Sequence, residues 1–379
     1  MPRILDLSFS PLTRDARVLR QLSVVSEFAE VTTCGYGPAT PYSHDHVEIP
    51  ADAPSLPQTP RGVVDLALRR HRASDLAAPG SAAVLDRLAM RRFDLVIAND
   101  ARALPLAHAV ADGAPIWADL HEWAPEERTH VIAWRLLVAP WIDSVCRRYL
   151  PLTAAQTTVG TRIAALYEER YGVRPLLMRN AAPYADLAPS PVAPDGPLRL
   201  VHSGAAIPGR GLDAMIDAVL TAGDSFRLDL YLVAGGDRGA HLRDLRARAA
   251  GCERVVFHDP VPPAALPATL NAYDVGVFWI PPTTTNARLT LPNKLFDFVQ
   301  ARLALAVGPS IEMAEIVGEH RLGVVSDGFE VERIVDSLRT LTPQRVAAFK
   351  EASHRAAPAL SFEHEAQTAR RILSDLLGA

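Results

Sequence analysis

The sequence predicts an α/β protein made of two doubly wound domains, each a parallel sheet covered by helices. Short apolar runs alternate with longer amphipathic runs along the whole chain, which is the pattern of successive β-α-β units. A proline-rich segment interrupts this alternation near the middle of the chain, after which it resumes. The length of 379 residues also suits two domains of ordinary size.

The first domain is expected over residues 1–182. Its opening strand is followed by a helix over residues 14–29, because Val18, Leu22 and Val25 recur at helical spacing. Asp15 stands where this helix begins and suits an N-cap. The expected strands are the short apolar runs at residues 3–9, 31–34, 94–98, 116–120 and 156–159.

A linker is expected over residues 183–197, within a stretch that carries five prolines and little apolar periodicity. The second domain follows over residues 198–358, and residues 359–379 hold a final amphipathic helix. Strands are expected in the second domain at residues 198–202, 228–233, 254–257, 275–279, 305–307 and 322–325.

The composition excludes several classes of protein. Hydrophobic residues make up 49% and charged residues 22%, so the chain is not broadly disordered. The 39 basic residues against 43 acidic ones give a net charge of −4, which argues against a general nucleic-acid binder. No run is long and apolar enough to span a membrane, and the start does not have the pattern of a signal peptide. The three cysteines form no CxxC pair or disulfide framework, so we expect a reducing, cytoplasmic location.

Several motifs of well-known enzymes do not occur in the sequence. Neither half has GxGxxG after a strand, and no phosphate loop, HExxH or GxSxG occurs. These absences argue against NAD enzymes, P-loop ATPases, zinc proteases and serine hydrolases. No residue cluster has metal-ligand spacing, so neither a metal nor a cofactor is expected.

A glycine-bearing loop follows the first strand of the second domain, in the sequence HSGAAIPGRGL. Free backbone N–H groups and the Arg210 guanidinium at a helix start could bind a diphosphate beside Gly204 and Gly209. An ordinary turn with a solvated arginine is an equally good interpretation.

The segment LPNKLFDF starts another helix of the second domain, with Pro292 in its first turn. Lys294 and Asp297 are three residues apart and share one helix face, which could offer a cation to phosphate and a carboxylate to ribose. The alternative is a surface ion pair of little energetic value. Only Lys294 and Lys350 are lysines among the 39 basic residues, which favours the functional interpretation of Lys294.

In the first domain, His121 and Glu122 follow the strand at residues 116–120. An imidazole at that position can donate to a sugar hydroxyl or to a developing anion, although a structural histidine is the alternative. Two loops of the second domain, around Gly236 and His258, also close strands, and glycines there let a ligand approach the backbone.

Two segments combine arginines with apolar residues, at residues 63–72 and 130–150. Each could contact a membrane surface, such as the inner face of the plasma membrane, or a lipid-linked substrate. A helix packed within the first domain is the favoured interpretation of the longer segment.

With these residues in place, the chain resembles glycosyltransferases of the GT-B fold, and most of all family 4. In that family a Gly-Arg pair and a later lysine hold the donor diphosphate. Gly204 matches the glycine, Ala205 replaces the arginine, and Arg210 takes the place of the lysine. Asp297 matches the second of two family glutamates, which binds ribose, whereas Leu289 stands at the first.

The Pro-Asn-Lys-Leu-Phe-acid segment is similar to that of bacterial surface-polysaccharide transferases of this family. The resemblance also matches His121 to the family histidine that contacts the transferred sugar, and it implies two Rossmann-like domains that face each other across a cleft. The last helix would cross back onto the acceptor-side first domain.

The resemblance implies transfer of a sugar from a nucleotide diphosphosugar with retention at the anomeric carbon and without a metal. The acceptor would be a glycan, a lipid-linked sugar or a small molecule. A non-catalytic nucleotide-sugar-binding subunit and a nucleotide-sugar epimerase of the same fold are the alternatives. The implied roles are catalysis for His121 and Glu122; diphosphate binding for Gly204, Gly209, Arg210 and Lys294; ribose or nucleotide binding for Gly236, His258 and Asp297; and sugar binding for Leu291 and Asn293.

Overall fold

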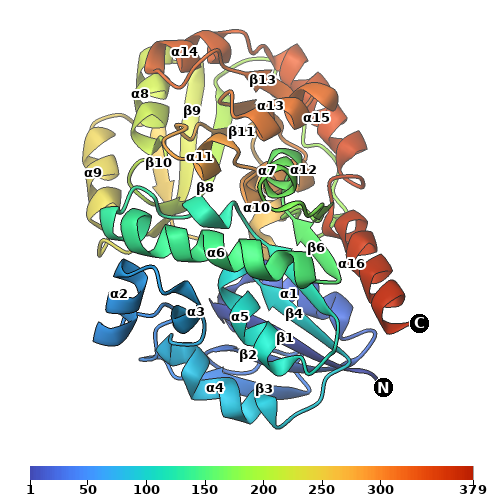
Figure 1. The fold of residues 1–379 in the computed structure, drawn as a ribbon. Coiled ribbons are helices and arrows are strands. Elements are labelled where there is room, and N and C mark those ends of the chain that lie inside the picture. The colour runs from blue at the N-terminus through green and yellow to red at the C-terminus, as the bar shows by residue number, and fades with distance from the viewer. Residues whose placement is uncertain (379) are drawn as a thin grey trace. The chain divides into compact units, whose positions relative to one another are not determined.

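A computed structural model describes residues 1–378 (Figure 1). The chain divides into two compact units, of which the second is Asn180–His364. The first unit is Met1–Arg179 together with the end of the chain from Glu365. Each unit is built on one parallel sheet, so the predicted class of two doubly wound α/β domains is confirmed.

The sheet of the first unit has the strand order β3-β2-β1-β4-β5-β6-β7. The order reverses between β1 and β4, and such sheets bind ligands at the carboxyl ends of the strands at that point. The five strands expected here are all present. The strands are β1 (Arg3–Pro11), β2 (Glu30–Tyr36), β3 (Asp45–Ile49), β4 (Leu95–Asn99), β5 (Ile116–Leu120), β6 (Ala155–Thr158) and β7 (Leu176–Leu177).

The strand β3 was not expected, because its sequence DHVEI has no continuous apolar run. Only Val47 and Ile49 are fully buried among its five residues. The strand pairs with β2 at one edge of the sheet, where one of its sides stays unpaired. An edge strand of this kind needs few apolar residues, and its sequence signal is correspondingly weak.

The helices of the first unit lie against this sheet. Helix α1 begins after Asp15, whose carboxylate accepts hydrogen bonds from the backbone N–H groups of Arg17 and Val18, so the predicted N-cap is confirmed. The helices are α1 (Ala16–Val25), α2 (Pro60–Ala67), α3 (His71–Ser74), α4 (Pro79–Ala89), α5 (Leu104–Val110), α6 (Ala139–Tyr149) and α7 (Thr161–Tyr171).

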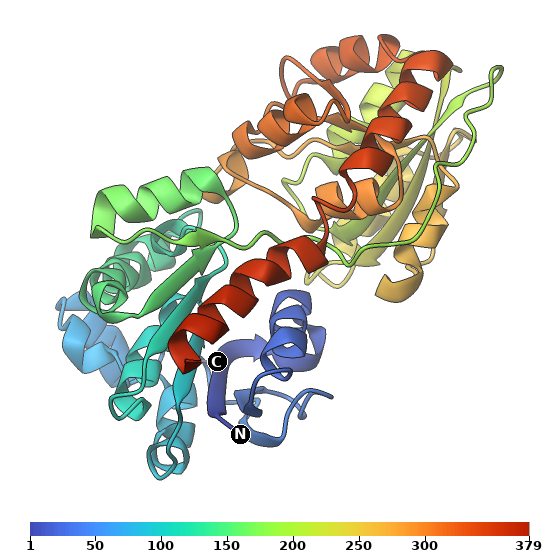
Figure 2. The ribbon, with the colours of Figure 1, turned by 90° about the vertical axis from the view of Figure 1, so that its right-hand side faces the viewer.

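The last helix, α16 (Phe362–Leu377), is joined to the first unit by two ion pairs. Glu365 accepts hydrogen bonds from the backbone and guanidinium of Arg179, and Arg370 pairs with Glu27 at 2.9 Å. Figure 2 shows this helix in red beside the first unit.

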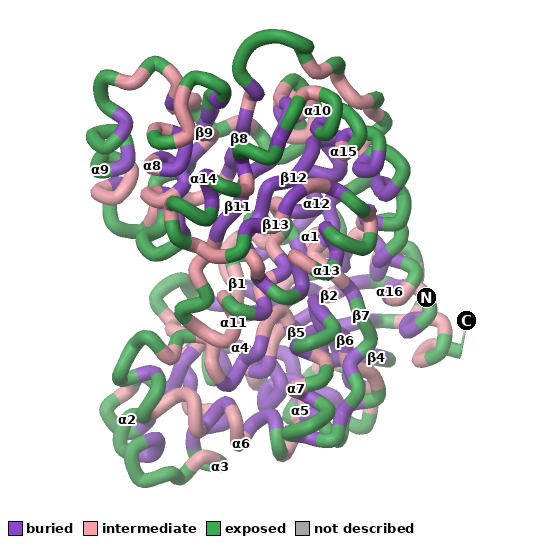
Figure 3. The backbone as a smooth tube through the Cα atoms, turned by 90° about the horizontal axis from the view of Figure 1, so that it is seen from above, coloured by how far each residue is buried: buried purple, intermediate pink, exposed green. Residues whose placement is uncertain are grey.

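The second unit has the strand order β10-β9-β8-β11-β12-β13, which reverses between β8 and β11. Its six expected strands are present. Successive residues such as Leu200 and Val201 belong to two separate apolar clusters, so both faces of the sheet are buried. Figure 3 shows β11 and β12 as buried. The strands are β8 (Leu198–Ala206), β9 (Phe226–Ala234), β10 (Val255–His258), β11 (Val275–Phe278), β12 (Ala304–Val307) and β13 (Gly323–Val325).

Eight helices surround this sheet in the described residues. They are α8 (Leu212–Ala222), α9 (Ala240–Arg248), α10 (Leu266–Asn271), α11 (Thr285–Arg288), α12 (Asn293–Gln300), α13 (Ile311–Glu319), α14 (Val331–Arg339) and α15 (Pro343–Ala356).

Residues 183–197, the expected linker, lie within the second unit. The buried Lys350 ammonium donates to the Ser190 hydroxyl at 2.8 Å and to the Tyr273 carbonyl at 2.7 Å. The Asn271 amide donates to the Ala188 carbonyl at 2.9 Å. The proline-rich segment is therefore fixed along the second unit, and this is the structural role of the second lysine of the chain.

Candidate functional site

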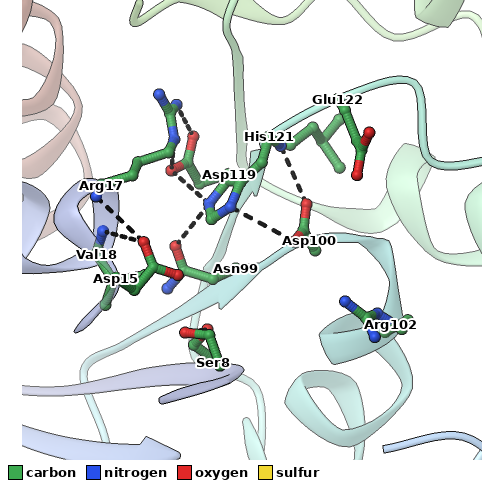
Figure 4. A network of polar contacts seen from close by, with 12 residues as sticks. Ser8, Asp15, Arg17, Val18, Asn99, Asp100, Arg102, Asp119, His121 and Glu122 are labelled. Carbon is green, nitrogen blue, oxygen red and sulfur yellow. Dashed lines mark hydrogen bonds and ion pairs between the residues drawn. The ribbon is translucent and has the colours of Figure 1, made fainter. Parts of the chain in front are cut away.

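Polar side chains gather at the carboxyl ends of β1, β4 and β5 in the first unit (Figure 4). They come from positions next to the reversal of strand order. The strand β5 ends in Asp119 and Leu120, and His121 and Glu122 follow directly. The sheet thus brings together residues that are far apart in the sequence.

Asp119 is fully buried and paired with Arg17 from α1. The guanidinium donates to both carboxylate oxygens, at 2.8 and 2.6 Å, and Thr157 donates to one of them at 2.6 Å. Burial alone would raise the pKa of Asp119, but the charges of Arg17 and His121 hold it well below its ordinary value. Asp119 is therefore a fixed negative charge beneath the site.

The imidazole of His121 lies between two carboxylates. Its Nδ1 is 3.4 Å from Asp100 and its Nε2 is 3.3 Å from Asp119. Burial alone would lower the pKa of His121, but Asp100 and Asp119 raise it to about 9. The ring is consequently an imidazolium at neutral pH and can donate hydrogen bonds from both nitrogens.

Asp100 was missed by the sequence analysis. It has φ +68°, in a region that costs a non-glycine residue of the order of 1–3 kcal/mol. Its carboxylate accepts from the His121 backbone N–H at 3.1 Å, and its own N–H donates to the Asp119 carbonyl at 2.8 Å. The strained residue therefore fixes the backbone and the ring of His121. The polar pair Asn99-Asp100 after the buried run LVIA was the signal that could have revealed it.

A second buried acid lies below Asn99. The Asn99 amide donates to Asp6 at 3.0 Å, while its carbonyl oxygen is 3.3 Å from Nε2 of His121. Burial and the neighbouring Asp119 raise the pKa of Asp6 well above its ordinary value. Burial thus favours the protonated form of Asp6, and its contact sets the orientation of the Asn99 amide.

Glu122 is half-buried, and the described residues offer no hydrogen bond to its carboxyl group. Burial, with the nearby Glu127 and Asp100, raises the pKa of Glu122 to about 8. Its backbone carbonyl is fixed by the Tyr167 hydroxyl at 2.8 Å. At neutral pH the side chain is a carboxylic acid and can donate a hydrogen bond.

In the second unit, Lys294 and Gly204 lie against each other. A β-carbon on Gly204, which has φ +146°, would lie 2.6 Å from the Lys294 Nζ. The ammonium also lies 5.6 Å from the centre of the Phe278 ring. The space left by the glycine is therefore filled by the end of the lysine side chain.

The Lys294 ammonium has no hydrogen-bond acceptor or ion pair within residues 1–378. Burial and the charge of Arg210 lower its pKa, an effect that Asp297 partly offsets. Burial, Lys294 and Arg210 lower the pKa of His202 to about 3, so this imidazole is neutral. Its Nδ1 lies 2.8 Å from the Val277 carbonyl. Arg210 and Lys294 thus both act on the buried His202, and Asp297 balances their two positive charges only in part, which is an electrostatic condition that favours anion binding.

Two helix starts add donors to this region. Helix α12 begins at Asn293 after Pro292, and no side chain caps it. Helix α8 follows Gly211, also without a side-chain cap. Gly211 has φ +73°, and a β-carbon there would lie 1.9 Å from the Trp279 carbonyl, so only glycine fits. The uncapped N–H groups favour an anionic ligand.

The remaining predicted site residues of the second unit differ in how far they are buried. Gly209 has φ +78° and open space around it, and Gly236 has no atom within 4 Å of where its β-carbon would be. Arg210 and Asn293 are exposed, whereas the Leu291 side chain is buried in an apolar cluster.

The side chain of His258 is bound within its own sheet. It lies 2.5 Å from an Asp229 oxygen and stacks on Tyr231. Its side chain is nevertheless 33% exposed.

Within residues 1–378, no group of three or more His, Cys, Asp or Glu is arranged to hold a metal ion. None of the helices in this range is long and apolar enough to cross a membrane.

No protein-family model and no curated protein matches the chain, but solved structures match it over nearly its full length. The Anabaena protein HepE in complex with UDP and glucose is 14% identical, with a TM-score of 0.72 over 99% of this chain and 100% of that one. Sucrose-phosphate synthase from Thermosynechococcus elongatus is 11% identical, with a TM-score of 0.68 over all of both chains. The α,α-trehalose 6-phosphate synthase from Burkholderia multivorans is 13% identical, with a TM-score of 0.62 over 100% and 97%. These neighbours have the GT-B fold, and the likeness shows that this chain has it too.

Proposed function

We propose that this protein is a retaining, family 4-like glycosyltransferase that moves a sugar from a nucleotide diphosphosugar to an acceptor hydroxyl. The observation that supports this most is the half-buried Lys294 ammonium at Gly204, which has no acceptor among the described residues. A diphosphate would supply the missing oxygens and would offset the repulsion between Lys294 and Arg210. Because HepE structures contain UDP and UDP-glucose, a UDP-sugar is the first donor to test.

The chemistry would depend on neutralising the leaving group. As the sugar–oxygen bond breaks, negative charge grows on the nucleoside diphosphate, and Lys294, Arg210 and the N–H groups that start α12 would stabilise it. These cations would take the role that a metal plays elsewhere, so we propose a metal-independent reaction. Asp297 would accept from the ribose hydroxyls.

We assign contacts with the transferred sugar or the acceptor to His121 and Glu122. Both groups carry a proton at neutral pH, because the pKa of His121 is about 9 and that of Glu122 about 8. Both can therefore donate to sugar hydroxyls. The acceptor would be a glycan, a lipid-linked sugar or a small molecule.

A non-catalytic nucleotide-sugar-binding subunit is the second candidate. Two positions favour it, since Ala205 replaces a cation of the resembled family and the buried Leu289 replaces a carboxylate. This candidate predicts donor binding without turnover in the presence of acceptors. An epimerase of the same fold would instead convert the donor when no acceptor is present.

Calorimetric titration with UDP and UDP-glucose tests the donor site. We expect Lys294→Met to lower the affinity at least tenfold, whereas Arg355→Ala, an exposed arginine of the same unit, leaves it unchanged. With a donor that supports turnover, EDTA should leave the transfer rate unchanged. NMR of the product should show that the transferred sugar keeps the anomeric configuration it has in the donor. Equal affinity of the Lys294→Met variant and the wild type would refute the site.

A further inference from the structure

Two segments of the first unit form one exposed face that the proposed transfer reaction does not use. Helix α2 contacts the helical turn at Trp134–Val138. The Arg69 guanidinium, just after α2, donates to the Leu136 carbonyl at 2.9 Å. Segments about 65 residues apart in the sequence are thus joined, and we call the surface of residues 60–74 and 128–138 the arginine–aliphatic face.

Large aliphatic side chains are concentrated on this face. Of the sixteen exposed large hydrophobic residues in the described chain, six lie here, from 42% to 65% exposed. Soluble proteins rarely leave such clusters in contact with water unless a partner covers them. The six are Val63, Val64, Leu68, Val131, Ile132 and Leu136; Figure 3 shows the largely exposed course of α2.

The net charge of the arginine–aliphatic face is opposite in sign to the net charge of the whole protein. The chain carries a net charge of −4, yet these segments hold six arginines and a single acid. That acid, Asp65, is buried and lies 3.9 Å from Arg61 and 3.7 Å from Arg70. The exposed charged side chains within the face are therefore all arginines, of which Arg128 pairs with the adjoining Glu127 at 3.3 Å: Arg61, Arg69, Arg70, Arg72, Arg128 and Arg135.

Contacts made by buried side chains fix the segments that form the arginine–aliphatic face. Trp134 is buried, and the Arg128 guanidinium lies 5.6 Å from the centre of its ring. After α3, buried Asp75 accepts hydrogen bonds from Trp141, Arg148 and Tyr149 of α6. The aliphatic side chains are consequently presented on a fixed support and cannot easily fold inward.

We infer that the arginine–aliphatic face docks the protein on a membrane surface rich in anionic phospholipid. Aliphatic side chains between arginines match the chemistry of such a surface, because the former enter the acyl boundary while guanidinium groups pair with lipid phosphates. A nucleic-acid site would use arginines without exposed valine and leucine, and a protein partner would not require so uniform a positive charge. The inference does not depend on the proposed transfer activity.

Sedimentation with vesicles tests this inference. We expect the full chain to sediment with phosphatidylglycerol–phosphatidylcholine vesicles, to remain in solution with pure phosphatidylcholine, and to be released by salt. Ile132→Glu should lower the partition coefficient at least tenfold, and Arg72→Gln and Arg135→Gln about fivefold each. The control is Met90→Glu, which changes an apolar residue that is 81% exposed outside the face and should bind like the wild type.

Several results would overturn the inference. The inference is contradicted if the wild-type protein does not bind vesicles that contain phosphatidylglycerol, or if it binds both kinds of vesicle equally. Unchanged binding by Ile132→Glu would also contradict it. A change of oligomeric state in Ile132→Glu without lipid would show that the face binds protein instead. Melting temperatures confirm that each variant is folded, and UDP titration reports separately on the donor site.

Discussion

The Lys294 side chain lies across Gly204, so that a β-carbon on residue 204 would stand 2.5 Å from its Cε and 2.6 Å from its Nζ. The atoms in the way are the end of a flexible side chain rather than backbone. A larger residue at 204 would therefore displace the ammonium more readily than it would unfold the unit. The glycine and the lysine, 90 positions apart, act as one feature of the site.

Replacing Gly204 by alanine should weaken nucleotide binding as much as removing the lysine charge does. We expect Gly204→Ala to lower the affinity for UDP about tenfold or more, measured by calorimetry, because the ammonium is pushed from its place. Gly318→Ala is the matched control, since nothing lies near that position in α13. If Gly204→Ala binds UDP as tightly as the wild type, the ammonium does not contact the ligand.

Gly236→Ala tests whether a ligand approaches the backbone after β9. The unliganded structure has open space at this position, so the melting temperature should not fall. We expect a loss of UDP affinity of several-fold, because the added methyl group would meet the nucleotide and not the protein. Unchanged affinity would place the nucleotide elsewhere.

The sequence predicts where the strands of both sheets lie, but not which strand ends become neighbours. His121 could be predicted as a site residue because it follows a buried apolar run. Its partner Asp100 follows a different strand, and their contact depends on the order of β4 and β5. Arg17 and Asp119 are 102 residues apart and carry no shared local pattern, and the single acid within the run IWADL gives no sign that it is the buried partner of a helix arginine.

The expected linker also shows how far the sequence alone can predict contacts. Proline content predicts a linker, and the segment lies within the second unit. Proline content does not predict what the segment packs on, which depends on a buried lysine 160 residues away from Ser190. Pairings over such distances are properties of the assembled unit and leave no periodic signal.

Removing Arg17 should strongly destabilise the first unit. Arg17→Met breaks the buried ion pair with Asp119 and leaves His121 as its neighbouring cation, and the loss of one partner of a buried pair typically costs about 3–5 kcal/mol. We expect a large fall in melting temperature, which Arg17→Met combined with Asp119→Asn should partly reverse. Arg14→Met, at an exposed arginine nearby, should have little effect. No recovery in the double variant would mean that Arg17 acts through packing and not through the ion pair.

The acid form of Glu122 should set an upper pH limit on transfer. With a pKa of about 8, Glu122 loses its proton above that pH, and its ability to donate to a hydroxyl is lost with it. We expect kcat/KM to fall above pH 8 in the wild type. In Glu122→Gln, which cannot ionise, the fall should move toward pH 9, where His121 loses its proton. If kcat/KM falls near pH 8 in both proteins, ionisation of Glu122 is not the cause of the fall.

The charge on His121 should stabilise the first unit in a defined pH window. The folded pKa of about 9 lies above the ordinary value of 6.5, so the stabilisation is complete below pH 6.5 and is lost as the pH rises through 9. The difference corresponds to roughly 3 kcal/mol. We expect the wild-type melting temperature to fall between pH 6.5 and 9, and to fall much less in His121→Gln. His44→Gln, at an exposed histidine of the same unit, should keep the wild-type slope. If His121→Gln keeps that slope as well, the imidazole between Asp100 and Asp119 is not the group that titrates.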